Sequence, residues 1–132
     1  MLLQSALMCL AMNIYHEARS EPVNGRIAIA EVTLNRVASK HYPDDICGVV
    51  YQKGKSTCQF SWTCDGASDT PHEKEAFNDA IRLAETMLVE GDNISAVGKN
   101  VTHYHNKTVK PYWLVDVTKV REIGNHIFYK IK

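Results

Sequence analysis

Two apolar patterns with the period of an α-helix occupy the N-terminal part of the chain. The first predicts a helix over residues 2–18 with one buried face. Pro22 breaks this pattern, and a wider apolar face then predicts a second helix over residues 23–39. The apolar positions that define the first face are Leu3, Leu7, Leu10 and Ile14.

The stretch over residues 40–66 is interrupted by Pro43, Gly48, Gly54 and Gly66, which predicts a loop-rich region. Within it, residues 49–51 form a short apolar run. Its pattern fits a short strand and a short helix equally well.

The third helix has the clearest start signal. Thr70 stands at a predicted N-cap, Pro71 in the first turn and Glu73 three residues after the cap, which together make a capping box. Gly91 is the predicted end of the helix.

The pattern becomes strand-like after residue 97. Residues 101–105 and 126–131 are rich in β-branched and aromatic side chains, which predicts two strands. Residues 111–113 read as a loop, and residues 118–123 as one helical turn. The sequence therefore predicts an α+β fold that is mainly α, with a small β element, in a single domain over residues 1–132.

Charge is balanced overall but not along the chain. The 132 residues contain 15 Lys and Arg against 15 Asp and Glu, which argues against a dedicated nucleic-acid-binding protein. Residues 65–92 carry two basic and eight acidic groups, whereas residues 93–132 carry seven basic and two acidic groups. The net charge is therefore −6 for residues 65–92 and +5 for residues 93–132, which we call the +5 segment. The simplest interpretation is a solvated acidic helix beside a solvated basic segment.

The first apolar run is too short to cross a bilayer and has no basic region before it. We therefore expect no integral membrane segment and no signal peptide. We also expect a monomer.

Glu17 is the first candidate for chemistry, because it lies at the C-terminal end of an apolar predicted helix. The helix dipole and an apolar setting both disfavour a negative charge there. A carboxyl group that stays protonated near neutral pH can donate a proton to a substrate. The alternative is that Glu17 simply pairs with Arg19.

Aromatic and polar side chains in two later segments suit sugar binding, through ring stacking and hydrogen bonds to hydroxyl groups. The alternative for the aromatic residues of the first segment is that they anchor a loop to the core. The candidate substrate-binding residues are Gln59, Phe60, Ser61, Trp62, His103, Tyr104, His105, Tyr112 and Trp113.

A rival interpretation makes Cys58, Cys64, His103 and His105 a zinc site. Their spacing does not match the common zinc motifs, so we expect no metal and no cofactor.

The four cysteines leave other questions open. Cys9 lies in the apolar first helix, which predicts a buried small hydrophobic residue. Cys47, Cys58 and Cys64 allow three pairings, and free thiols are expected while the chain remains in a cytoplasm.

Several segments together resemble the SleB-type cell wall hydrolase family, which includes spore cortex-lytic enzymes and phage or bacterial muralytic enzymes. The resemblance extends in order over nearly the whole chain. It departs from the family at Ser20, where many relatives have Gly before the second Glu. The segments that carry it are residues 13–22, 27–37, 42–43, 47–52, 58–61, 102–105, 111–113 and 123–129.

The resemblance implies a lysozyme-like domain that cleaves the glycan strands of peptidoglycan between N-acetylmuramic acid and N-acetylglucosamine. It places the catalytic glutamate at Glu17 and favours a lytic transglycosylase, which forms 1,6-anhydro ends. A hydrolytic muramidase would need a second carboxylate nearby. The candidates are Glu21, Glu31 and Asp65, of which Glu21 is expected to be solvated and Glu31 has the alternative of a buried structural acid.

Because no separate wall-binding domain or export signal is evident, we expect an endolysin-like lysin. It would be made in the host cytoplasm and would act on the cell wall after release or export. The +5 segment is expected to lie along the glycan groove. If the domain is not an enzyme, the alternative is a non-catalytic peptidoglycan-binding module.

Overall fold

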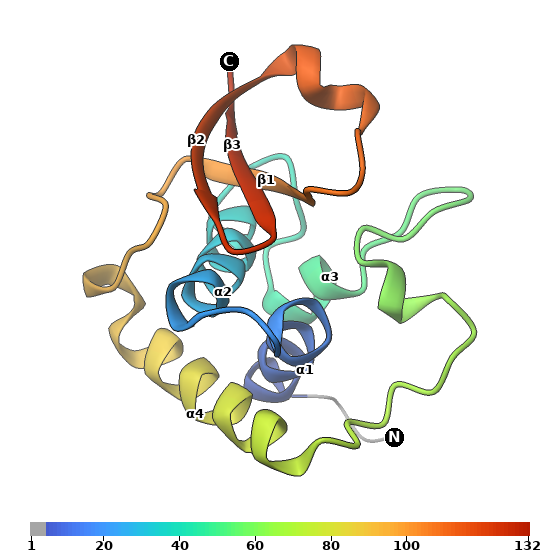
Figure 1. Ribbon diagram of the computed structural model, residues 1–132, viewed down its shortest axis with the longest axis vertical. Coiled ribbons are helices and arrows are strands. Elements are labelled where there is room, and N and C mark those ends of the chain that lie inside the picture. The colour runs from blue at the N-terminus through green and yellow to red at the C-terminus, as the bar shows by residue number, and fades with distance from the viewer. Residues whose placement is uncertain (1–4) are drawn as a thin grey trace.

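The computed structural model describes residues 5–132 and has the mainly helical α+β architecture that the sequence predicts (Figure 1). Among the described residues, four α-helices precede a small sheet, which forms the C-terminal part of the chain. The helices are α1 (Ala6–Ala18), α2 (Val23–Val37), α3 (Ile46–Val50) and α4 (Lys74–Glu90), and the strands are β1 (Val101–Asn106), β2 (Val117–Ile123) and β3 (His126–Ile131). Three 3₁₀ turns connect them, namely η1 (Ser61–Thr63), η2 (Gly91–Asn93) and η3 (Tyr112–Asp116).

Helices α1 and α2 confirm the two N-terminal predictions. Helix α1 begins after Ser5, whose side chain accepts a hydrogen bond from the backbone N–H of Met8 at 3.1 Å, as a serine N-cap does. Residues 2–4 of the predicted helix lie outside the described residues. Residues 49 and 50, which the pattern left undecided, belong to α3, which Asp45 caps through the N–H of Gly48.

The predicted capping box of the third helix is wrong. Helix α4 begins at Lys74, its N-cap is Glu73, and no side chain caps it. Glu73 instead forms an ion pair with Arg19, and its backbone N–H donates to the hydroxyl of Tyr15 at 3.1 Å. Contacts from α1 therefore replace the local cap. The predicted end at Gly91 is confirmed.

The sheet is antiparallel in the order β1-β3-β2. The helical turn predicted at residues 118–123 is wrong, because this segment is β2 and pairs along its length with β3. Gly124, at φ +55°, provides the left-handed turn between the two strands. Only Val117 and Ile123, at the ends of β2, are buried, so the apolar alternation that marks a strand is missing from its middle. The loop predicted at residues 111–113 is wrong for two of them, because Tyr112 and Trp113 begin η3 and only Pro111, its N-cap, precedes it.

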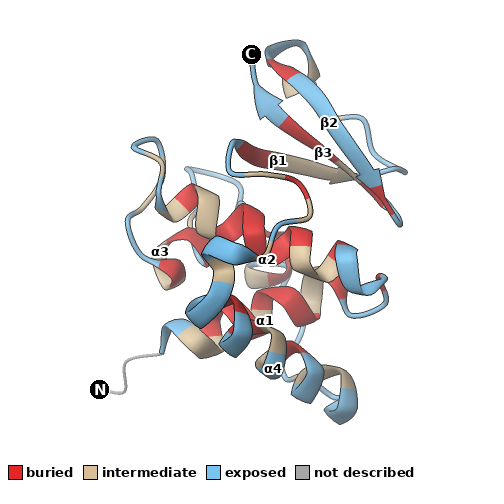
Figure 2. Cartoon of the chain, turned by 90° about the vertical axis from the view of Figure 1, so that its left-hand side faces the viewer, coloured by how far each residue is buried: buried red, intermediate tan, exposed pale blue. Residues whose placement is uncertain are grey.

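Two apolar clusters hold these layers together. The larger joins one side of α2 to α1, α3, α4 and the segment around η1, and the smaller joins α2 to the inner face of the sheet. Figure 2 shows the buried positions concentrated on α1 and α2, which lie between α4 and the sheet. Phe128 of β3 and Ile29 of α2, both fully buried, belong to the smaller cluster.

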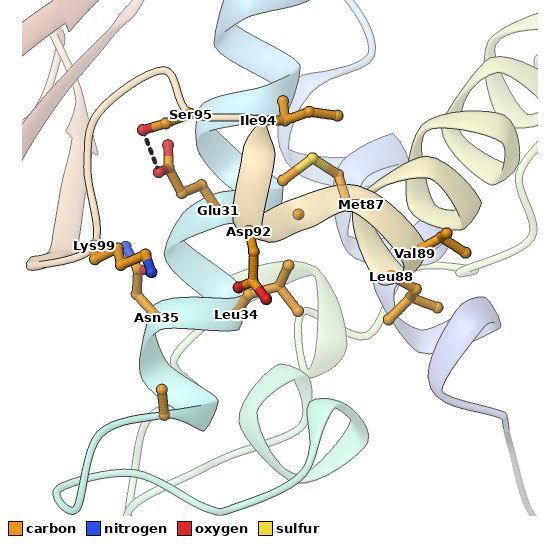
Figure 3. Close-up of a pocket in the computed structure, with 12 residues that line it drawn as sticks. Glu31, Leu34, Asn35, Met87, Leu88, Val89, Asp92, Ile94, Ser95 and Lys99 are labelled. Carbon is orange, nitrogen blue, oxygen red and sulfur yellow. Dashed lines mark hydrogen bonds between the residues drawn. The ribbon is translucent and has the colours of Figure 1, made fainter.

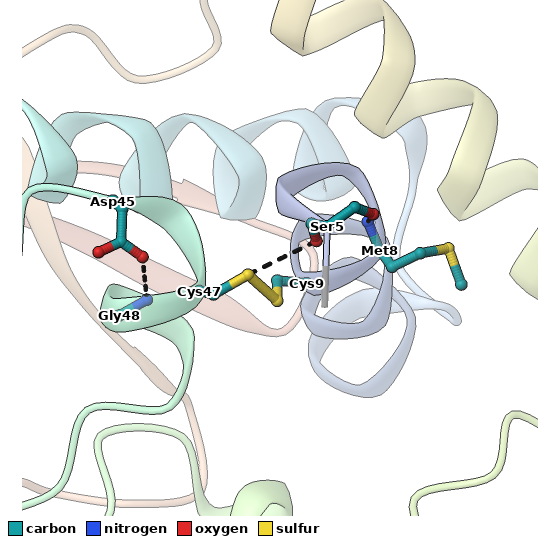
Figure 4. Close-up of a disulfide and its surroundings, with 6 residues drawn as sticks. All are labelled: Ser5, Met8, Cys9, Asp45, Cys47 and Gly48. Carbon is teal, nitrogen blue, oxygen red and sulfur yellow. Dashed lines mark hydrogen bonds between the residues drawn. A yellow bond between two sulfur atoms is a disulfide. The ribbon is translucent and has the colours of Figure 1, made fainter. Parts of the chain in front are cut away.

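Disulfides pair Cys9 with Cys47 and Cys58 with Cys64. The predicted burial of Cys9 is confirmed, because it is fully buried. The prediction that pairing involves only Cys47, Cys58 and Cys64 is wrong for Cys47, whose partner is Cys9. Figure 4 shows the Cys9 sulfur bonded across to Cys47, which ties α1 to α3. Sequence could not show this pairing, because the two residues meet only when α3 packs on α1.

Along residues 5–132, no helix has both the length and the apolar character needed to cross a membrane.

Candidate functional site

A pocket of about 430 Å³ opens between the C-terminal end of α1, the loop before η1, and the sheet. It brings together seven of the residues proposed from the sequence, from segments up to 96 positions apart in the chain. These are Glu17, Gln59, Phe60, Ser61, Tyr104, His105 and Trp113. Six further lining residues were not proposed for catalysis or sugar binding, namely Arg36, Cys58, Asn106, Val109, Pro111 and His126.

Glu17 lies in the last turn of α1 and is partly buried in the pocket wall. The hydroxyl of Tyr104 donates a short hydrogen bond to Glu17 Oε1. Arg19, the alternative partner proposed from the sequence, pairs with Glu73 instead. Glu17 is therefore held by a neutral donor rather than by an adjacent cation.

Burial is the main influence on the Glu17 carboxyl group, and it raises the pKa above the usual value. The Tyr104 hydrogen bond and the charges of His126, Arg36 and His16 oppose this rise without cancelling it. The carboxyl group consequently keeps its proton to a higher pH than an exposed glutamate does, which suits a general acid.

Tyr104 is fixed from several sides. Its ring packs against those of Phe60, Phe128 and His126, with centroids 6.4, 5.5 and 5.3 Å away. Burial, followed by the neighbouring Glu17, raises the pKa of its hydroxyl well above the usual value. Tyr104 therefore stays protonated and acts as a donor that orients Glu17.

Arg36, in the last turn of α2, is a buried cation that was not among the residues predicted from the sequence. Its Nε donates to the carbonyl of Thr102 at 2.9 Å, and its guanidinium group lies over the rings of Tyr42 and Phe60. Its Nη1 has no hydrogen-bond partner among the described residues. An arginine at the end of a helix resembles an ordinary C-terminal charge, so its position gave no signal.

Glu21 and His126 form a buried pair next to the pocket. The expectation that Glu21 is solvated is wrong, because only 6% of the residue is exposed. Glu21 accepts hydrogen bonds from the backbone and side chain of Asn125 and from Nδ1 of His126. The β2–β3 turn closes over this carboxylate, a tertiary contact that the local sequence does not reveal.

An aromatic cluster forms the rim of the pocket on the side of the sheet. The rings of His105 and Tyr129 stack with centroids 5.3 Å apart, and Nε2 of His105 lies 2.7 Å from the Tyr129 hydroxyl. The Trp113 ring stands edge-on to both and to His103. Burial, followed by the charge of Arg36, lowers the pKa of His103, so this ring favours its neutral form.

Three proposed binding residues do not line this pocket. Trp62 is a core anchor, because its Nε1 donates to the buried Asn13 at 2.8 Å and its ring stacks on His16. His103 lies beside Trp113, outside the lining residues. Tyr112 is 93% exposed on η3.

Glu31 and Asp65 also lie away from this pocket. Glu31 faces a separate hollow between α2 and η2, shown in Figure 3, where its carboxylate reaches Ser95. It accepts hydrogen bonds from the Ser95 hydroxyl and from the backbone N–H groups of residues 96, 97 and 98 at 2.6 to 3.2 Å. Asp65 is exposed and caps its own loop through the N–H of Ala67.

We expect Glu31→Gln to lower the free energy of unfolding by about 2 kcal/mol. The two carboxylate oxygens of Glu31 now accept from four donors, and in the variant one of these oxygens is replaced by an NH₂ group that cannot accept. Urea denaturation measures this change, with Glu85→Gln on the exposed face of α4 as the control. The specific activity of the folded variant should stay at the wild-type level. A loss of activity without loss of stability would contradict the structural role.

The rival zinc site needs Cys58 and Cys64 as thiolates, but they are bonded to each other. Within residues 5–132, no group of three or more His, Cys, Asp or Glu side chains is arranged to hold a metal ion.

The +5 segment does reach the pocket, through Tyr104, His105, Asn106, Val109, Pro111, Trp113 and His126. None of its lysines, nor Arg121, is among the described residues that line it. The segment thus supplies aromatic and polar surface there, while its lysine and arginine charges lie elsewhere.

Solved structures with the same fold show which class of domain this is. The chain matches the catalytic domain of the germination-specific lytic transglycosylase SleB from Bacillus anthracis with a TM-score of 0.72 and 29% identity, covering 98% of this chain and 97% of that one. It matches the catalytic domain of the Bacillus cereus SleB protein with a TM-score of 0.67 and 30% identity, covering 95% and 89%. The lysozyme-like fold expected from the sequence is confirmed.

Sequence comparison gives the same relatives. The chain is 30% identical over 130 residues to the spore cortex-lytic enzyme of Bacillus cereus, covering 96% of this chain and 45% of that protein. It therefore spans about half the length of the full-length relatives that it matches. The family model for cell wall hydrolases matches residues 20–129. With this match over most of its length, the chain belongs to the cell wall hydrolase family.

Proposed function

We propose that this domain cleaves peptidoglycan glycan strands between N-acetylmuramic acid and N-acetylglucosamine, with Glu17 as the general acid. The observation that carries the proposal is a carboxyl group with a raised pKa, oriented by Tyr104, in the wall of an open pocket. Gln59, Ser61 and His105 supply polar groups for sugar hydroxyls and N-acetyl groups, and Trp113 supplies a ring for stacking.

The reaction is a lytic transglycosylation. Glu17 gives its proton to the glycosidic oxygen as the bond from the muramyl C1 breaks, through an oxocarbenium-like transition state. The muramyl O6 then attacks C1 and closes a 1,6-anhydro ring, so no water is consumed. The names of the structural relatives, both SleB catalytic domains and one titled a lytic transglycosylase, support this class of reaction.

The carboxylates of the described chain give less support to a hydrolytic muramidase. Glu31 and Asp65 do not line the pocket, and Glu21 is occupied by Asn125 and His126. None of them is placed in the pocket as a separate nucleophile or water-activating base. A pocket built around a carboxyl group with a raised pKa likewise favours an enzyme over a non-catalytic peptidoglycan-binding module.

Mass spectrometry of the muropeptides released from purified peptidoglycan tests the reaction type. We expect products with 1,6-anhydromuramyl ends, 18 Da lighter than the hydrolytic products because no water is added. Reducing muramyl ends would instead establish the hydrolytic reaction. Release of no saccharide from any wall would contradict the enzymatic proposal.

We further propose that the domain acts on the wall side of a membrane, in an endolysin-like setting. The two disulfides support an oxidising compartment over a cytoplasm. Clearing of vegetative walls at a rate equal to or above that of spore cortex would support this setting. Clearing of cortex alone would assign the domain to the role that its relatives' names describe.

A further inference from the structure

We propose that His126, oriented by Glu21, is the second proton-transfer residue of this site and accepts the proton of the attacking hydroxyl group. This inference rests on the proposed glycan cleavage and adds a second group to the reaction that Glu17 begins. A second carboxylate near Glu17 was expected only for the hydrolytic alternative, with Glu21 among its candidates. The structure places Glu21 against the imidazole of His126, which lines the pocket.

Glu21 is held in one orientation by the β2–β3 turn. Its Oε1 accepts from the backbone N–H of Asn125 at 2.8 Å, and its Oε2 accepts from Asn125 Nδ2 at 3.0 Å. A Cβ atom at Gly124 would lie 2.5 Å from Glu21 Oε1, so a glycine is needed for this close approach. The carboxylate is therefore fixed before any substrate binds.

This fixed carboxylate determines the tautomer of His126. Nδ1 of His126 lies 3.2 Å from Glu21 Oε1, an oxygen that already accepts from Asn125. Nδ1 must therefore carry the proton and donate it. In the neutral ring Nε2 is then left unprotonated, with a lone pair that can accept a proton, as in other carboxylate–histidine pairs.

His126 lies close to the proposed acid. It lines the same pocket as Glu17, and its ring stands edge-on to that of Tyr104, with centroids 5.3 Å apart. Tyr104 in turn donates to Glu17, and Glu17 and His126 interact electrostatically. The wall of one pocket thus contains both a carboxyl group with a raised pKa and an imidazole ring.

The two groups divide the proton transfers between them. Glu17 donates its proton to the leaving oxygen as the bond from C1 to that oxygen breaks. The O6 hydroxyl forms the new bond to C1 and gives its proton to His126 Nε2. The resulting imidazolium is stabilised by Glu21, and transfer of that proton back to the Glu17 carboxylate through solvent restores both groups, with no net proton or water consumed.

The charged and titratable groups around this imidazole come from every element packed against it. They are Glu21 from the α1–α2 connection, Glu17 from α1, Arg36 from α2 through its field at Glu17, and Tyr104 from β1. For the reaction, Nε2 of His126 must be free to accept a proton and Glu17 must carry one.

Two substitutions test whether His126 acts as a base or only makes a structural contact with Glu21. In His126→Asn, the side-chain NH₂ occupies the place of Nδ1 and can still donate to Glu21, but no group remains at the place of Nε2. We expect it to fold like the wild type by circular dichroism and to lose about 10² to 10⁴-fold in kcat, with KM for soluble glycan strands little changed. Glu21→Gln should give a smaller loss in kcat, because the imidazole remains but loses the carboxylate that orients it.

The split between kcat and KM provides the decisive readout. In His126→Asn, kcat should fall while KM for soluble glycan strands stays near the wild-type value. The control is His72→Gln, an exposed histidine before α4 that lies outside the pocket and should leave both kcat and KM unchanged. A folded His126→Asn that keeps kcat within a few fold of the wild type would overturn the proposal.

Glu17→Gln distinguishes failure of the proposed glycan cleavage from failure of the proposed role of His126. If Glu17→Gln is inactive and His126→Asn is active, glycan cleavage stands and the role of His126 falls. If Glu17→Gln is fully active, the assignment of Glu17 as the acid falls first. Should His126→Asn fail to fold, His126→Gln, which places an amide near Nε2 without a basic nitrogen, tests the same loss.

Discussion

Replacing Glu17 with Gln is expected to lower the rate of peptidoglycan cleavage by about 10² to 10⁴-fold, the usual contribution of a general acid. The amide keeps the size of the side chain and an oxygen that can accept the Tyr104 hydrogen bond. It has no acidic proton to give to the glycosidic oxygen. Loss of turbidity of a peptidoglycan suspension measures the rate, with Glu85→Gln on α4 as the matched control.

The same substitution is expected to preserve or raise stability near neutral pH. Burial raises the pKa of Glu17 in the folded chain above its unfolded value of 4.5. The folded state therefore binds this proton more tightly, and the stability it gains below pH 4.5 is lost as the pH rises through the folded pKa. Because Gln stays neutral, its advantage over Glu should grow across that window in urea denaturation at several pH values.

Activity should follow the proton on Glu17 in the same direction. The rate is expected to fall on the alkaline side as the pH rises through the raised pKa of this carboxyl group. A Glu17→Gln protein that clears walls at the wild-type rate would remove Glu17 from the mechanism. One that is inactive and also unfolded would require Glu17→Ala to be compared by the same two measurements.

Removing the Cys9–Cys47 disulfide is expected to cost about 4 kcal/mol of unfolding free energy. The bond closes a loop between residues separated by 38 positions, which restricts the unfolded chain. Cys9→Ala with Cys47→Ala is the suitable pair, because Cys9 is fully buried and a serine hydroxyl there would be poorly accommodated. Urea denaturation under non-reducing conditions measures the loss.

The second disulfide provides the internal comparison. Cys58 and Cys64 are only six positions apart, so removing their bond should cost less, about 2 kcal/mol. Cys58 also lines the pocket, so this pair of substitutions is expected to affect activity as well. Equal losses for the two pairs, or a larger loss for the short loop, would contradict the account based on chain entropy.

The helices that build the site were predictable because their signals are local. The apolar spacing that defines α1 is a property of a few neighbouring residues, as is the position of Glu17 at its end. The capping box at Thr70 and the helical turn at residues 118–123 were wrong for the opposite reason. In both places a contact with a distant segment replaces the local preference. At Glu73 the contacts come from Tyr15 and Arg19, and at residues 118–123 the contact is the pairing with β3.

The sequence by itself determined a mainly helical domain, a resemblance to cell wall hydrolases and a single glutamate as the proposed acid. Only the tertiary structure decided which partners surround that glutamate. Tyr104, Arg36 and His126 come from three different elements, and Glu21 is buried only because the β2–β3 turn folds over it. Hydrogen bonding and burial depend on residues far apart in the chain, so the pKa of Glu17 and the pairing of Glu21 with His126 follow from packing, which no local pattern encodes.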